Sequence, residues 1–211
     1  MNHLIGATLL ASLVILLLGY FLGCLNGSVM VSHFIIKDDV RQHGSGNAGL
    51  TNFYRTYGAK YALGVILFDM GKTVIACLIG GAAFDYLAGD WMLGVLLGGL
   101  GCELGHMFPV FFGFKGGKGV SSTCGVMLMT FWWQALICYV ITIALIAITK
   151  FVSLGSLALV VLFGILVTAT NWGNWLVIAW VWVIAGLCIY RHHANIGRLI
   201  HGTERKIGQK A

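Results

Sequence analysis

The sequence predicts an all-α, polytopic membrane protein. Of its 211 residues, 59% are hydrophobic and only 9% are charged, whereas a soluble domain carries about 25% charged residues. Apolar stretches of about 20 residues, the length that a helix needs to cross a bilayer, recur along the chain. No low-complexity linker and no fixed-period repeat divides it, so we predict one integral membrane domain over residues 1–211.

Polar loops separate the first three predicted spans. The first apolar stretch covers residues 4–26, and neither Lys nor Arg precedes it. It also lacks a clear small-residue cleavage site, so we interpret it as a span and not as a signal peptide. The second and third spans are expected near residues 61–84 and 91–112, on either side of a short acidic loop.

The apolar region from Val120 to Thr149 is too long for one span. As a single helix its 30 residues would reach about 45 Å, against a hydrocarbon layer of about 30 Å. We therefore expect a break near Trp132, Trp133 and Gln134. With further spans at 151–170 and 175–190 the total is seven, and five spans would keep the same parity if segments merged.

The distribution of Lys and Arg predicts the orientation, because short cytoplasmic loops hold these residues in excess. Four lie in residues 37–60, two in residues 113–119 and five in the tail from Arg191, whereas the loop at 85–90 has acids and no base. We expect the N-terminus outside and the C-terminus in the cytoplasm. This topology signal alone accounts for Lys37, Lys60 and Lys210.

The first basic loop contains a segment rich in small polar residues, GSGNAGLTNFYR at 44–55. Glycines let backbone N–H groups turn toward an anion, while hydroxyl, amide and guanidinium groups add donors. The segment therefore predicts a phosphate cradle, with an ordinary turn between spans as the alternative. Its candidate residues are Ser45, Gly46, Asn47, Thr51, Asn52 and Arg55.

A second loop, GHMFPVFFGFKGGKG at 105–119, contains the only proline of the chain and two lysines. It lacks the spacing of a Walker A motif. Lys118 lies between two glycines, and we expect this mobile cation to reach a phosphate. Lys115 is equally well explained as a topology signal.

The third segment, RHHANIGR at 191–198, follows the last span. Helical spacing places His192 and Asn195 on one face, continued by Arg198. The paired histidines have no matching Cys or carboxylate ligands, so no metal site is predicted. A basic tail that contacts lipid headgroups is the alternative. Ser153 and Ser156 offer two hydroxyls near Lys150, although small residues also serve helix packing.

Four ionisable residues fall within the predicted spans, where charge is costly unless it is paired or faces a cavity. Asp69 and Lys72 are spaced to pair with each other at i, i+3, and Glu103 and His106 lie in the next span. A structural and a catalytic role remain open for these residues.

Taken together, GSGNAGLTNFYR, GHMFPVFFGFKGGKGV and RHHANIGRLIHGTE resemble the three cytoplasmic motifs of the bacterial acyl-phosphate:glycerol-3-phosphate acyltransferases, the PlsY family. The resemblance covers essentially the whole chain. Two segments depart from the family pattern: the stretch 27–30 lacks an expected proline, and Gly71 precedes Lys72 where a following glycine is expected.

The resemblance implies a seven-helix enzyme at the cytoplasmic face of the bacterial plasma (inner) membrane. It would transfer a fatty acyl group from acyl phosphate to the 1-hydroxyl of glycerol 3-phosphate, the first step of phospholipid synthesis, giving lysophosphatidic acid and phosphate. Membrane lipid surrounds such an enzyme, and no metal, cofactor, nucleic acid or obligate protein partner is expected. Without a legible Ser-His-Asp arrangement, no covalent acyl-enzyme is predicted.

The resemblance also assigns residues to the two substrates. It casts Ser45, Gly46 and Asn47 with Lys118 and Ser156 around the acyl phosphate, and Arg55, His192 and Asn195 around glycerol 3-phosphate. Thr51, Asn52, Gly116, Gly117 and Ser153 join them as expected substrate-binding residues. Either His192 or a phosphate oxygen of the substrate would take the hydroxyl proton.

A transporter or channel for a phosphorylated metabolite is the main alternative, because cationic loops and interrupted helices also line transport pathways. A pathway needs polar residues in both halves of the membrane, and the outer loop at Trp172, Gly173 and Asn174 is uncharged. The acidic and Arg/His signatures of lipid phosphatases and CDP-alcohol transferases are absent. The H-x4-D pair His33 and Asp38 resembles part of another acyltransferase family, whose other motifs are missing.

Overall fold

The computed structural model describes the backbone of residues 2–209 and the side chains of residues 6–209. The ends of the expected 1–211 domain, with Lys210, lie outside the described residues. Within this part all regular elements are helical. They are α1 (Asn2–Cys24), α2 (Gly27–Met30), the π-helix η1 (Val31–Ile36), the 3-10 helix η2 (Val40–Gln42), α3 (Leu50–Tyr57), α4 (Ala62–Ala88), α5 (Trp91–Met107), the 3-10 helix η3 (Val110–Phe112), α6 (Val120–Thr130), α7 (Trp132–Thr149), α8 (Val152–Thr170), α9 (Trp175–Arg191) and α10 (His193–Ile200).

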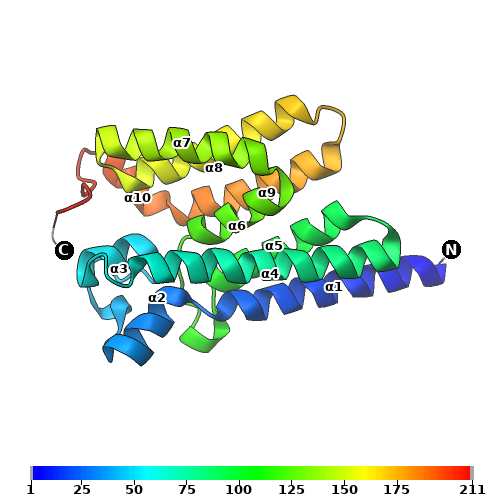
Figure 1. Ribbon diagram of the computed structural model, residues 1–211, viewed down its shortest axis with the longest axis horizontal. Coiled ribbons are helices and arrows are strands. Elements are labelled where there is room, and N and C mark those ends of the chain that lie inside the picture. Colours follow the sequence, from blue (N-terminus) through cyan, green and yellow to red (C-terminus); the bar gives the residue numbers. More distant parts are fainter. Residues whose placement is uncertain (1, 210–211) are drawn as a thin grey trace.

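Two groups of long helices form the molecule (Figure 1). Helices α1, α4 and α5 contact one another, α8 contacts both α7 and α9, and the short α6 lies between the groups against α4, α5 and α7. Close backbone contact joins α1 to α5, because a Cβ atom at Gly105 would collide with the backbone of Tyr20. Small residues at such crossings let membrane helices pack tightly.

Five helical segments of the described chain are long and apolar enough to cross a membrane: Gly6–Ile36, Ala62–Ala88, Trp91–Phe112, Trp132–Thr149 and Val152–Thr170. Helices α9 and α10 are bent by 61° at their junction and give a sixth span if the pair counts as one. A polytopic helical membrane protein is therefore confirmed, and the count of seven stays a prediction.

The break expected in the region 120–149 occurs at Phe131, immediately before the tryptophans. There the backbone departs from helical geometry, with φ −133° and ψ 70°. With 11 residues, α6 is about 17 Å long, roughly half of a hydrocarbon layer of about 30 Å. The preceding loop, which carries Lys118, continues into this short helix.

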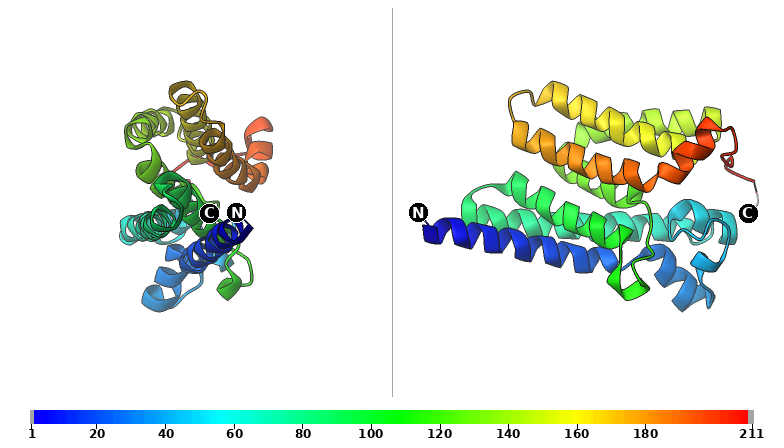
Figure 2. Two further views of the ribbon diagram at one scale, coloured as in Figure 1. Left: turned by 90° about the vertical axis from the view of Figure 1, so that its right-hand side faces the viewer. Right: turned by 180° about the vertical axis from the view of Figure 1, so that it is seen from behind.

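The polar segments gather at one end of the bundle. The C-terminal tail, α10 and α3 lie at the end opposite the start of α1 in both Figure 1 and the right-hand view of Figure 2. These elements carry the first and third motifs, which the chain thereby brings together at one end.

Candidate active site

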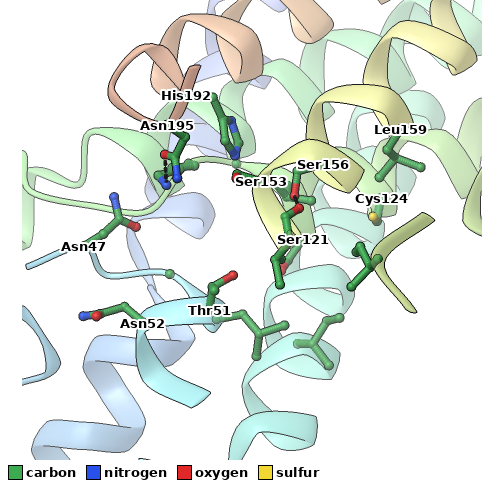
Figure 3. A pocket seen from close by; sticks show the side chains of 18 of the residues that line it. Asn47, Thr51, Asn52, Ser121, Cys124, Ser153, Ser156, Leu159, His192 and Asn195 are labelled. Carbon is green, nitrogen blue, oxygen red and sulfur yellow. Dashed lines mark hydrogen bonds between the residues drawn. The ribbon is translucent and has the colours of Figure 1, made fainter. Parts of the chain in front are cut away.

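A cavity of about 390 Å³ opens at this end of the molecule. The predicted site residues reach it from four separate parts of the chain: the segment from residue 45 through α3, the loop before α6, the start of α8 and the junction of α9 with α10 (Figure 3). All five predicted catalytic residues and five of the predicted binding residues line this cavity: Ser45, Asn47, Thr51, Asn52, Arg55, Lys118, Ser153, Ser156, His192 and Asn195.

Lys118 is held by a hydrogen bond from its ammonium group to Oδ1 of Asn195, drawn as a dashed line in Figure 3. Burial lowers the pKa of Lys118 to about 8, an effect that the Glu204 carboxylate opposes and that the nearby Arg198, Arg55 and Arg191 reinforce. The lysine is thus a largely desolvated cation at neutral pH, and such a group interacts strongly with an incoming phosphate.

Arg55 lies in the last turn of α3 and faces the same cavity. Its Nη2 donates to the carbonyl oxygen of Arg205 at 2.8 Å, while its Nε is buried without a hydrogen-bond partner. Burial lowers the pKa of this guanidinium from its usual value. A buried donor without a partner costs about 1–3 kcal/mol, so an anion bound here would relieve that cost.

Asn52 braces the loop that carries Ser45. Its Oδ1 accepts from the Ser45 backbone N–H at 3.0 Å, and its Nδ2 donates to the carbonyls of Val40 and His43, both at 3.0 Å. Gly46 has φ +69° in the same turn and is not a lining residue. These contacts give Asn52 and Gly46 a role in shaping the loop, and their expected substrate contacts stay predictions.

Gly116 and Gly117 do not line the cavity either. The Gly117 N–H donates to the His106 carbonyl at 3.0 Å, and a Cβ atom at Gly117 would collide with the His106 ring. Arg191 Nη2 donates to the carbonyl oxygens of Gly117 at 3.0 Å and Gly116 at 3.4 Å. The two glycines therefore let the loop pack against the end of α5 and present Lys118.

His192 is 2% exposed and forms the junction between α9 and α10. Its Nδ1 lies 2.8 Å from the carbonyl oxygen of Cys188. A carbonyl only accepts, so Nδ1 carries the proton and Nε2 of the neutral ring is left as an acceptor. Asn195 follows in the first turn of α10, on the face that the helical spacing predicted.

The two predicted hydroxyls of α8 also line the cavity. Ser153 Oγ donates to Glu204 Oε1 at 2.7 Å, and Ser156 Oγ donates to the backbone carbonyl of Val152 at 3.0 Å. Both hydroxyl oxygens keep lone pairs, but their protons are already engaged.

The other end of the cavity is apolar. Helices α4, α6, α7 and α8 contribute to it, and it includes Tyr139, whose hydroxyl donates to the Cys124 carbonyl at 2.6 Å. Its lining residues are Ile66, Met70, Val120, Cys124, Tyr139, Ile143, Ile146 and Leu159. These residues were not predicted, because the sequence does not distinguish an apolar side chain that lines a cavity from one that faces lipid.

Five polar lining residues were also not predicted as site residues: His106, Ser121, Thr142, Arg198 and Glu204. Arg198 and Glu204 lie within the third motif, and this position could have identified them as site residues. The pair His33 and Asp38 does not line the cavity, and Asp38 instead lies 2.8 Å from His43.

The predicted pairing of Asp69 with Lys72 is confirmed at 2.7 Å, and neither residue lines the cavity. Lys72 Nζ donates to the carbonyls of Gly23 at 3.0 Å and Leu25 at 2.8 Å, and Asp69 Oδ1 accepts from the Gly27 N–H at 3.0 Å. The pair therefore satisfies backbone groups at the break between α1 and α2. This contact set favours the structural role.

Comparisons with known proteins agree with the motif resemblance. The family profile of glycerol-3-phosphate acyltransferase matches residues 13–202. A glycerol-3-phosphate acyltransferase of Thermoanaerobacter pseudethanolicus is 39% identical over 194 residues, covering 92% of this chain and 94% of the relative. One from Shouchella clausii is 41% identical over 197 residues, covering 92% and 95%.

Solved structures are similar as well. The crystal structure of PlsY (YgiH), an integral membrane glycerol 3-phosphate acyltransferase, in its glycerol 3-phosphate form matches with a TM-score of 0.83 and 34% identity. That match covers 93% of this chain and 96% of PlsY. The lysophosphatidic acid form matches with a TM-score of 0.80, covering 93% and 95%.

Proposed function

The chain belongs to the glycerol-3-phosphate acyltransferase family, and from this premise we propose how its cavity makes lysophosphatidic acid from glycerol 3-phosphate and an acyl phosphate. One observation carries the proposal. Lys118, Arg55 and neutral donors gather at one end of a cavity whose other end is apolar. Such a cavity matches a donor with a phosphate head and a hydrocarbon tail.

The polar end would bind both phosphate groups. Ser45, Asn47, Lys118 and Ser156 would surround the phosphate of the donor, and Arg55, His192 and Asn195 would hold glycerol 3-phosphate. The half-buried cation of Lys118 and the buried, unpartnered Nε of Arg55 support this division. Cations with rigidly placed donors are the groups that recognise phosphate most strongly.

The apolar end would hold the first part of the acyl chain. Ile66 and Met70 of α4 line it together with Ile143 and Ile146 of α7. Burying hydrocarbon here stabilises the complex by about 0.8 kcal/mol per methylene. The carbonyl carbon would then lie between the apolar and polar ends, beside the glycerol hydroxyl.

The reaction needs little covalent participation by the protein, because an acyl phosphate is an activated mixed anhydride. The 1-hydroxyl oxygen attacks the carbonyl carbon, the bond from this carbon to the phosphate oxygen breaks, and inorganic phosphate departs with the bonding electrons. Positioning of the two substrates and stabilisation of the departing phosphate by Lys118 supply the rate enhancement. The hydroxyl proton goes to His192 Nε2, which its Nδ1 contact leaves as an acceptor, or to a phosphate oxygen.

We further propose that the site faces the cytoplasm of the bacterial plasma membrane, with the N-terminus outside and seven spans. The gathering of the first basic segment and the basic tail at the end of the bundle that carries the site supports this orientation. Helix α6 would be the short seventh span, which begins inside the membrane because the Lys118 loop reaches inward.

An assay with purified protein tests the donor and the role of Lys118. Given palmitoyl phosphate and radiolabelled glycerol 3-phosphate, the protein should form lysophosphatidic acid, and Lys118→Ala should abolish product. Lys115→Ala is the matched control, because Lys115 is an exposed cation of the same loop outside the cavity and should leave activity intact. Equal product from acyl-CoA alone would contradict acyl phosphate as the donor. An active Lys118→Ala variant would contradict the proposed role of Lys118 in the site.

A further inference from the structure

Glu204 is a buried carboxylate at the edge of the phosphate-binding region, in the segment that follows α10. Its side chain is 4% exposed, and it is the only acidic residue among the described residues that line the cavity. Oε1 accepts from Ser153 Oγ and Asn195 Nδ2, both at 2.7 Å, and Oε2 accepts from Arg198 Nε at 2.7 Å. Three donors therefore converge on one carboxylate.

These contacts fix the orientation of the Asn195 amide. An ionised carboxylate only accepts hydrogen bonds and an ammonium group only donates them. With its NH₂ group on Glu204, Asn195 must turn Oδ1 toward Lys118, as observed. The reverse orientation would set an oxygen against the carboxylate and an NH₂ against the ammonium, which is unfavourable on both sides.

The backbone around Glu204 is anchored on both sides. The Thr203 N–H donates to the Arg198 carbonyl at 2.8 Å, and the Arg205 carbonyl accepts from Arg55 at 2.8 Å. Further along, the Ile207 N–H donates to the Lys150 carbonyl at 2.8 Å. The segment is thereby attached to α3, α10 and the C-terminal end of α7, which fixes the position of the carboxylate.

Glu204 also balances the charges around Lys118. The guanidinium groups of Arg55, Arg191 and Arg198 all disfavour the protonated lysine, as does burial, while Glu204 favours it. Asn195 is neutral, and His192 is uncharged because burial lowers the pKa of its imidazole to about 4. Without this carboxylate, all charged side chains among the described residues that line the cavity would be cationic.

Resting on the proposed function, we propose that Glu204 is a positioning residue that holds the Lys118 ammonium, through Asn195, where the donor's phosphate binds. The carboxylate itself touches no reacting atom. It sets the direction of the amide, and the amide sets the place of the ammonium. In this way Glu204 of the third motif positions Lys118 of the second motif through hydrogen bonds made by Asn195.

Glu204→Gln tests the proposal, because it keeps the shape of the side chain and removes its charge. The KM for palmitoyl phosphate should rise about tenfold or more, the effect of losing one hydrogen bond to a charged group. The alkaline limb of kcat/KM should move to lower pH, which loss of a purely structural contact would not cause. Lys206→Ala, a neighbouring tail residue outside the cavity, should match the wild type.

A double-mutant comparison tests whether Glu204 acts on Lys118 through Asn195. If Glu204 acts through Asn195, Glu204→Gln should cost little further activity in an Asn195→Ala background. Multiplied losses, or an alkaline limb at the wild-type pH, would overturn the proposal. Should Glu204→Gln fail to fold, Glu204→Asp replaces it: a raised KM with a wild-type alkaline limb supports positioning, and a wild-type KM refutes it. A wild-type protein inactive with acyl phosphate would refute instead the proposed function.

Discussion

Lys72 lies 2.7 Å from Asp69, one turn earlier in α4, and the two charges together hold the break between α1 and α2. Both side chains are almost fully buried. Removing one member leaves the other charge uncompensated, which costs about 3–5 kcal/mol in protein interiors. We expect Lys72→Met to destabilise the folded protein by that amount, measured by denaturant unfolding in detergent.

The matched control is the double variant Asp69→Leu with Lys72→Met. It removes both charges, so it should be more stable than Lys72→Met alone, although the backbone groups of Gly23, Leu25 and Gly27 lose their partners. A double variant as unstable as the sum of the two single variants would contradict the buried pair as the cause.

The i, i+3 spacing predicted this ion pair, but its purpose could not be read from the sequence. Gly23 and Leu25 contribute backbone carbonyls, which have no side-chain signature. Lys118 could be predicted as a site residue from its charge. The packing of Gly116 and Gly117 on His106 could not, because backbone atoms make it, and the expected substrate contacts of the two glycines stay predictions. Residue types indicate which side chains can bind a phosphate, but only the tertiary structure shows which atoms line the cavity.

The pKa of Lys118, about 8, predicts the pH dependence of donor binding. A lysine is charged below its pKa, so kcat/KM for acyl phosphate should be constant near neutral pH and fall as the pH rises through about 8. Bound phosphate favours the protonated amine, so the limb in kcat should lie at higher pH. Initial rates measured across this range, at low and saturating donor, give both limbs.

Lys118→Arg is the control for this assignment. A guanidinium stays charged at all accessible pH values, so any residual activity should lose the alkaline limb. An unchanged limb in Lys118→Arg would assign the titration to another group.

Gly117 supports Lys118 by close packing on His106, so a methyl group there should disturb both. We expect Gly117→Ala to cost about 1–3 kcal/mol of stability, the usual range for overpacking, and to lower activity by displacing the lysine. Thermal unfolding and the palmitoyl phosphate assay measure the two effects. Gly71→Ala, at a helical position of α4 with open space around its Cβ, should be tolerated.

His106→Ala would vacate the space that the new methyl group needs. If the collision with the ring is the cause, combining it with Gly117→Ala should recover part of the loss measured against His106→Ala alone. A Gly117→Ala enzyme with wild-type kinetics would show that the loop moves without consequence for Lys118.

Tyr139 lines the apolar part of the cavity, and we expect it to set the acyl-chain preference. Its hydroxyl donates to the Cys124 carbonyl at 2.6 Å, and it comes first along α7 among the residues of this helix that line the cavity. Tyr139→Ala enlarges this part, and each further buried methylene contributes about 0.8 kcal/mol, about fourfold in kcat/KM. The ratio of kcat/KM for stearoyl over lauroyl phosphate should therefore rise.

Tyr139→Phe is the matched control, because it keeps the ring and should keep the wild-type ratio. Equal ratios in Tyr139→Ala and the wild type would mean that the chain leaves the cavity before it reaches the ring.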